Sequence, residues 1–143
     1  AAAGGEPGFL EAVEMRPMHG GDSEFDVLQS DPDGLTLVLG RFSAAEETPV
    51  HDHDSWGVAC VVRGRDRYRH WELDPAGRLR LLYEKELGPG TFVTWLGPPQ
   101  DIHSQQGIGE AAIELILFGK NVMEAPRHYY DLATGEVRTA LPR

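Results

Sequence analysis

Short apolar runs follow one another along this chain, and in several of them apolar residues alternate with polar ones. Successive side chains of a β-strand point to opposite faces, so this alternation predicts strands that bury one face. Clusters of glycine, proline and aspartate separate the runs, as at 31–34 and 88–90, and are typical of turns. We expect strands at 35–42, 47–51, 58–63, 66–72, 79–86, 91–96, 102–106 and 111–118.

Helical spacing is scarce, and only the short segments 9–15 and 23–29 are compatible with a helix. A succession of short antiparallel strands with regular turns predicts an all-β fold, either a jelly roll or a small barrel, with a short N-terminal helical segment. The chain has 143 residues, of which 41% are hydrophobic, enough for one core but not for two domains. We therefore expect a single domain over 1–143.

Charge and cysteine content limit the partners and the cellular compartment that we expect for the protein. Its 23 acidic and 13 basic residues give a formal net charge of −10, which argues against a nucleic acid or an anionic membrane as partner. No apolar run reaches the roughly 18 residues of a membrane span, and the first five residues do not resemble a signal peptide. The single cysteine, Cys60, favours a reducing compartment, so we expect a cytoplasmic protein with Cys60 as an inert core thiol.

Three histidines are the strongest candidates for chemistry. His51 and His53 share one face if they lie on a strand, and His103 follows a Gly-Pro-Pro turn about fifty residues later. Neutral imidazoles suit iron, zinc, nickel or copper, and three of them leave metal positions open for a substrate. Alternatively, the first two are solvated loop histidines beside Asp52 and Asp54.

The surroundings of these histidines resemble the cupins, and among them the thiol dioxygenases, cysteine dioxygenase and mercaptopropionate dioxygenase. The similar segments are Thr-Pro-Val-His-Asp-His at 48–53 with Trp-Gly and a later Arg-Gly behind it, Leu-Gly-Pro-Gly at 87–90, Gly-Pro-Pro-Gln-Asp-Ile-His at 97–103, Phe-Gly-Lys-Asn at 118–121 and the tail 129–135. Most cupins have a glutamate ligand where this chain has Gly57 and Val58, and the thiol dioxygenases lack it too. The resemblance spans about 35–137.

This resemblance implies a cupin double-stranded β-helix, which is a jelly-roll barrel, with His51, His53 and His103 as metal ligands. It implies a mononuclear non-haem Fe(II) dioxygenase that uses O2 on a small anionic chelating substrate, a thiol that becomes a sulfinate. Zn, Ni or Cu are alternative metals. Two other functions stay open: O2-dependent cleavage or oxidation of a β-dicarbonyl, an enolate or a pathway intermediate, and a non-catalytic cupin that binds a metal or ligand. Beyond substrate and O2 we expect no nucleic-acid or membrane partner, with the chain a monomer or homodimer.

The chain departs from the thiol dioxygenases in the strand before Gly119. Their Ser-x-His-x-Tyr run is replaced by Glu114, Ile116 and Phe118, which should all face the site because their spacing is two. Glu114 is either a buried carboxylate that acts as general acid or base, or a solvent-facing residue if the register slips by one. Val58 stands where cysteine dioxygenase has its crosslinked cysteine, so we expect no such crosslink.

Arginine and aromatic residues complete the expected pocket. Phe25 falls nearest to the place of the arginine that binds the carboxylate in cysteine dioxygenase, whereas Arg127 resembles the arginine of the mercaptopropionate enzymes. Arg127 is therefore either an anion clamp at the pocket or a surface charge. Trp56 and Trp95 are expected to pack in the pocket or core.

The other histidines carry weaker signals. His70 alternates with its neighbours on a predicted strand, and we interpret it as a surface or hairpin residue rather than a ligand. His19 and His128 lie in loop-like segments and have no ligand spacing.

Overall fold

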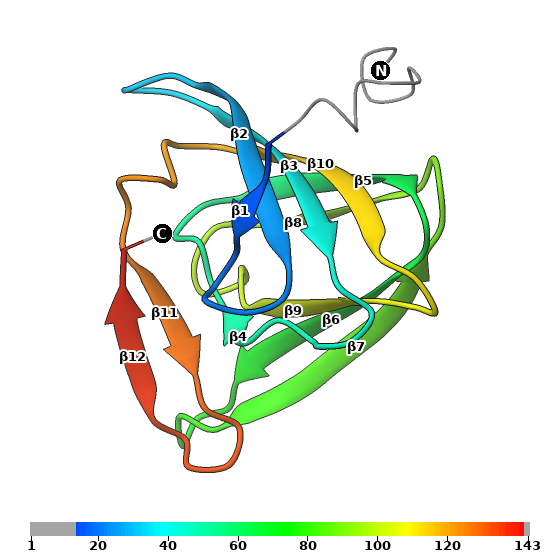
Figure 1. Cartoon of the computed structure of the whole chain (residues 1–143). Helices are drawn as coiled ribbons and strands as arrows, with labels where there is room; N and C mark the ends of the chain where they lie inside the picture. Colours follow the sequence, from blue (N-terminus) through cyan, green and yellow to red (C-terminus); the bar gives the residue numbers. More distant parts are fainter. Residues whose placement is uncertain (1–13, 142–143) are drawn as a thin grey trace.

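Two antiparallel β-sheets face each other in the computed structural model, which describes residues 14–141 (Figure 1). One sheet has the order β1-β2-β3-β10-β5-β8 and the other β12-β11-β4-β9-β6-β7. From β3 to β11 the chain crosses between the sheets at nearly every connection, which produces a jelly roll. The predicted all-β jelly-roll fold is confirmed. The strands are β1 (Arg16–Pro17), β2 (Glu24–Ser30), β3 (Thr36–Phe42), β4 (Val50–His51), β5 (Gly57–Arg63), β6 (Asp66–Leu73), β7 (Leu79–Leu87), β8 (Phe92–Trp95), β9 (His103–Gly107), β10 (Ala112–Phe118), β11 (Arg127–Tyr130) and β12 (Val137–Ala140).

Alternation along the strands builds the interior of the barrel. In β10 every second residue is buried and those between them are half-buried. The same pattern runs through β5, which pairs with β10 in the same sheet. The inward side chains form one core, which includes Phe25, Val38, Phe42, Val61, Tyr68, Trp95, Ile116 and Phe118.

Most predicted strands are found within one residue of their observed ends, but the segment 47–51 is an exception. Only Val50–His51 of that segment forms a strand, because the preceding residues bond to β9 through the Thr48 amide and hydroxyl instead of extending the ladder. β11 and β12 form a C-terminal hairpin, drawn in orange and red in Figure 1, that we did not predict.

The helix expected at 23–29 is wrong. That segment is β2, and it pairs with β3 so that Phe25 lies opposite Gly40 and Val27 opposite Val38. A seven-residue run is too short for its own spacing to decide between helix and strand, and pairing with β3 decides it. Of the other helical segment, 9–15, residues 9–13 lie outside the described residues, and the last two have no regular structure. Residues 14–141 contain no helix, and hence none that could span a membrane.

Gly57 leaves the space that Trp95 fills. The two residues are direct partners across β5 and β8, and a Cβ added at Gly57 would lie 2.1 Å from Cζ2 of the tryptophan ring. The Trp95 ring in turn lies 4.7 Å, centroid to centroid, from the ring of His103. A side chain at 57 would therefore displace a residue that packs on a candidate metal ligand.

Gly57→Ala is expected to destabilise the protein by about 2–3 kcal/mol, because buried overpacking forces the Trp95 ring to move. The measurement is urea unfolding followed by tryptophan fluorescence. Gly97→Ala is the matched control, since a Cβ there meets only the Trp56 amide nitrogen at 3.9 Å. Equal stabilities of the two variants would contradict the prediction.

Candidate metal centre

The three histidines predicted as ligands meet inside the barrel. His51 lies on β4 directly opposite His103 on β9, and His53 lies in the loop that follows β4. Their candidate ligand nitrogens all lie within 4.8 Å of one another, and the residues are 1–6% exposed. The two early histidines do not share a strand, since β4 ends at His51, as the predicted strand 47–51 does. The loop nonetheless places the His53 imidazole beside those of His51 and His103.

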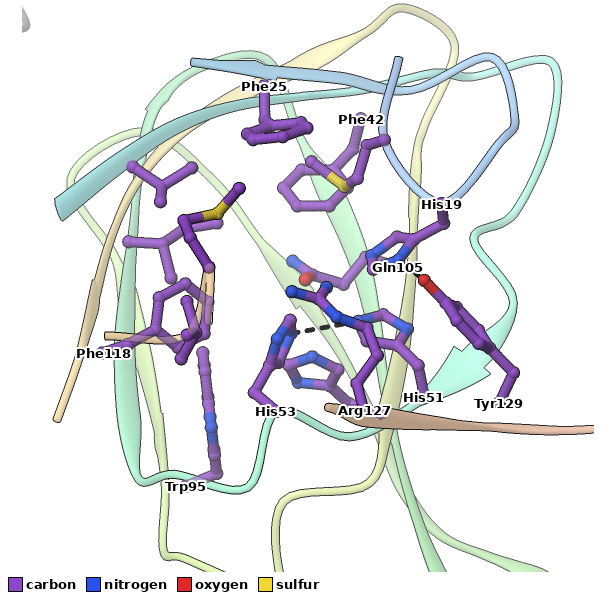
Figure 2. A pocket seen from close by; sticks show the side chains of 16 residues that line it. His19, Phe25, Phe42, His51, His53, Trp95, Gln105, Phe118, Arg127 and Tyr129 are labelled. Carbon is purple, nitrogen blue, oxygen red and sulfur yellow. Dashed lines mark hydrogen bonds between the residues drawn. The ribbon is translucent and has the colours of Figure 1, made fainter. Parts of the chain in front are cut away.

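His51 is held in the tautomer that a metal requires. Its Nδ1 donates a hydrogen bond to the Pro49 carbonyl oxygen at 2.7 Å, which directs Nε2 to the cluster. Burial lowers the pKa of His51 to about 3, so the imidazole is neutral at pH 7. Nε2 of His51 lies 3.1 Å from Nε2 of His53 (Figure 2).

His103 has the same arrangement with a different partner. Its Nδ1 lies 3.2 Å from the hydroxyl of Tyr68, a fully buried residue of β6, and its Nε2 is buried with no hydrogen-bond partner among the described residues. Burial also lowers the pKa of His53 and His103 well below the usual value. Three neutral imidazoles with converging nitrogens, one of them orphaned, fit a divalent transition metal.

The loop between the first two ligands is fixed by Asp52. This carboxylate is 6% exposed and accepts hydrogen bonds from the His128 amide and ring and from the Tyr130 hydroxyl, at 2.8–3.0 Å. The C-terminal strand β11 thus anchors the segment that carries His51 and His53. The alternative in which these two histidines are solvated is therefore excluded by their burial and by this anchor.

The cluster lies in the wall of a largely apolar cavity (Figure 2). The free space is about 50 Å³, equivalent to a few water molecules. Residues from both sheets contribute, so the cavity is the interior of the jelly roll rather than a surface groove. Its lining consists of Met18, His19, Phe25, Val38, Phe42, His51, His53, Trp95, His103, Gln105, Ile116, Phe118, Val122, Met123, Arg127 and Tyr129.

Three of the four residues predicted for the pocket line this cavity. Phe118 packs on His53 with ring centroids 4.5 Å apart, Trp95 packs on His103, and Ile116 lies between the sheets. Trp56 does not line the cavity and is 43% exposed. Trp56 precedes the inward-facing Gly57, so its side chain points to the outer side of the barrel. There the Trp56 indole covers Gly119, where an added Cβ would lie 2.2 Å from the indole Nε1.

Neither residue at the place of the cupin glutamate contributes a ligand. Gly57 has no side chain and no space for one, and Val58 is on the outward-facing, half-buried positions of β5. Cys60 shares that outward face and is half-buried, so its expected place in the core is wrong. The alternation of β5 sends Ala59 and Val61 inward instead.

Arg127 points into the cavity from β11. The residue is 7% exposed and its Nε has no hydrogen-bond partner among the described residues. Burial lowers its pKa, yet an arginine starts from so high a value that it keeps its charge. Of the two alternatives, the surface charge is excluded, and the cavity wall contains a buried cation whose Nε–H is free to donate.

Glu114 faces inward but does not reach the cavity. It is 0% exposed, and the side chain of Gln105 stands between it and the free space. The Gln105 amide nitrogen lies 3.2 and 3.3 Å from its two oxygens and 2.7 Å from Oδ2 of Asp66. The spacing of two along β10 correctly predicts the face of Glu114, but this depth gives it no contact with a bound substrate.

Burial raises the pKa of both acids in this pair, that of Asp66 to about 6 and that of Glu114 well above its usual value. In the folded protein this pair therefore retains protons that the unfolded chain loses near pH 4, so the contribution of the pair to stability falls as pH rises from about 4 through 6 and beyond. Glu114→Gln removes one of the two titrating groups and leaves the histidines in place. We expect the free energy of unfolding of the wild type, relative to that of the variant, to fall between pH 5 and 8 in urea titrations, and a constant difference would refute the shared burial cost.

Two cavity residues, His19 and Tyr129, were missed because neither has a ligand-like spacing. His19 occupies the turn between β1 and β2 with a φ of 55°, and its Nδ1 lies 2.8 Å from the Tyr129 hydroxyl. Its ring centroid is 4.0 Å from that of His51. A third missed residue, Gln105, could have been predicted from the sequence, since it lies two positions after His103 on the same strand and therefore faces the same side.

His70 is a residue of the β6–β7 hairpin rather than a ligand, as expected, but it is buried and not on the surface. It is 7% exposed, stacks on Tyr83 with ring centroids 4.9 Å apart, and lies opposite His103 across β6 and β9. It borders a separate hollow on the outer side of Trp95 and is not part of the histidine cluster in the described residues.

No family model and no curated protein sequence matches this chain. Solved structures do match. KdgF from Halomonas sp. is 17% identical with a TM-score of 0.57 over 76% of this chain and 89% of its own. A cupin-like protein from Thermotoga maritima is 18% identical, with a TM-score of 0.56 and 82% of each chain covered. A mutant of oxalate decarboxylase from Bacillus subtilis is 23% identical with a TM-score of 0.55, over 78% of this chain but only 28% of its own. At these identities the likeness establishes the fold, and the protein is a cupin-fold jelly roll with a three-histidine cluster inside its barrel.

Proposed function

We propose that this protein is a mononuclear non-haem Fe(II) dioxygenase that uses O2 on a small anionic chelating substrate. The observation that carries the proposal is the grouping, around one cavity, of three neutral buried histidines with the buried guanidinium of Arg127, whose Nε has no hydrogen-bond partner among the described residues. Three neutral ligands leave a bound divalent metal with its full charge and with open positions, which favours an anionic ligand. Bound iron supplies the redox centre at which O2 and substrate meet.

The protein's own residues would bind and shield the substrate. Arg127 offers hydrogen-bond donors to an anionic group in surroundings of low polarity, where charge-assisted hydrogen bonds are strong. Phe25, Phe42 and Ile116 exclude water from the same space. The small free volume limits the substrate to a few heavy atoms unless Met18 and Met123, which are flexible, move aside.

A thiol is the first substrate class to test, as the resemblance to thiol dioxygenases suggests. The reaction is RS⁻ + O2 → RSO2⁻, in which sulfur loses four electrons, O2 gains them, and both oxygen atoms enter the product. A β-dicarbonyl or enolate is the second class, because Ile116 and Phe118 make that wall of the cavity apolar and supply no acid or base. Both classes are anions with two donor atoms for one metal.

The test begins with metal analysis of the purified protein and anaerobic loading with Fe(II). Oxygen uptake is then recorded with a thiol panel of cysteine, 3-mercaptopropionate and cysteamine, and with acetylacetone as the diketone. We expect one iron per chain and uptake with at least one compound. Failure to bind iron would end the oxygenase proposal, and binding without uptake in either panel would favour a non-catalytic ligand-binding cupin.

A further inference from the structure

Gln105 is the uncharged amide among the polar side chains of the cavity wall. It lies on β9 two residues after His103, so both side chains point to the same face, and it is 2% exposed. Figure 2 shows its amide between the phenylalanine rings and the histidine cluster. The amide and the histidine cluster thus line the same cavity.

Two carboxyl groups hold the amide nitrogen of Gln105 from behind. It donates to Oδ2 of Asp66 at 2.7 Å and lies 3.2–3.3 Å from both oxygens of Glu114. Both acids are 0% exposed, which removes water as an alternative partner. The two hydrogens of the amide are thus used on the side away from the cavity.

The opposite orientation of the amide is strongly disfavoured. Above about pH 6, where Asp66 is ionised, it would put the Gln105 carbonyl oxygen against the carboxylate Oδ2 of Asp66 at the same separation, and two acceptors 2.7 Å apart repel each other in a buried site. The Asp66 and Glu114 pair therefore sets the direction of the amide. The carbonyl oxygen is left on the cavity side, and no donor in the part of the chain that the structure describes is bonded to it.

We propose that Gln105 determines substrate specificity: its fixed carbonyl oxygen favours small anions that carry a hydroxyl or amino group over the same anions without one. This inference rests on the proposed function, because it concerns the substrate of the same metal centre. Arg127 supplies a cation for the anionic group, and Gln105 supplies an acceptor for a donor on the same molecule. Together they define the substrate class as hydroxy- or amino-substituted acids.

The test compares matched pairs of ligands on Fe(II)-loaded protein without O2, so that it does not depend on turnover. The pairs are glycolate and acetate, lactate and propionate, and 3-hydroxybutyrate and butyrate, each titrated by calorimetry. In at least one pair the hydroxylated acid should bind about three- to tenfold more tightly, as expected for one hydrogen bond. Gln105→Leu should bring this ratio to about one with unchanged iron content. Gln106→Leu, which changes the neighbouring glutamine that bonds to the Ala44 carbonyl, should keep it.

A ratio near one in every wild-type pair, or a ratio that Gln105→Leu leaves intact, overturns the inference. Loss of iron in Gln105→Leu also overturns it, because the amide would then be a metal ligand.

The fixed orientation of the Gln105 amide is tested separately by nuclear magnetic resonance of its side-chain NH2 group. We expect slow hydrogen exchange that becomes fast in Asp66→Asn, together with a lower hydroxyl preference in that variant. Failure of O2 uptake alone would count against the oxygenase proposal and leave these binding ratios measurable.

Discussion

His103→Ala is expected to abolish measurable Fe(II) binding. The substitution removes one of three ligands whose nitrogens lie within 4.8 Å of one another, and the two remaining imidazoles cannot complete a three-coordinate protein site. Since outer-sphere changes alone cost 10- to 100-fold in metal affinity, loss of a direct ligand should cost about 1,000-fold or more. Anaerobic titration with Fe(II), read out as iron per chain after desalting, gives the result.

The matched control is His70→Ala. His70 is the direct neighbour of His103 across β6 and β9 and is also buried, but it stacks on Tyr83 outside the cluster. We expect it to keep full iron content. Thermal unfolding of both variants shows whether either loss comes from the fold, and equal loss of iron in two folded variants would show that the cluster is wrongly assigned.

Local patterns predicted the barrel because strand alternation reflects which face is buried. The inward positions of β5 and β10 follow from their spacing alone. β12 escaped prediction for the converse reason: three of its four residues are exposed, so its sequence has no buried face to alternate with. The segment that becomes β2 also lacks a pattern that decides between helix and strand. Its pairing with β3 decides it, and this pairing is a tertiary contact that the local sequence does not reveal.

The candidate site was predictable where its residues share a strand or a motif. The spacing of two indicated His51 and His53, and it would also have indicated Gln105 from His103. Spacing gives the face of a strand but not the depth below the cavity, which is why Glu114 points inward without touching the free space.

His19 and Tyr129 show a second limit of the sequence. Residue 19 lies in a turn near the start of the chain and residue 129 in the C-terminal hairpin, yet their side chains are 2.8 Å apart at the cavity (Figure 2). Their meeting depends on how two hairpins close the same end of the jelly roll. Nothing in the residues adjacent to either one predicts that contact.

Arg127→Met is expected to have opposite effects on ligand binding and on stability. A buried guanidinium with an unpartnered Nε pays for its desolvation without full compensation, so a methionine of similar shape should keep or raise the free energy of unfolding. The same change removes the cation that neutralises the substrate anion. We expect its KM, or the Kd of an anionic ligand, to rise about 30-fold or more, as for loss of a buried charged partner.

Iron content distinguishes this effect from damage to the metal centre. Arg127 lowers the pKa of the cluster histidines through its positive charge, and that charge also opposes a bound cation, so iron affinity in Arg127→Met should stay the same or increase. Arg138→Met is the control, because Arg138 lies over the Tyr129 ring on exposed β12 and outside the cavity. Arg127→Lys keeps the charge and should recover part of the lost affinity. If Arg127→Met binds anions as tightly as the wild type, the substrate anion is held by another group; if it loses both stability and iron, Arg127 is a structural residue of the barrel.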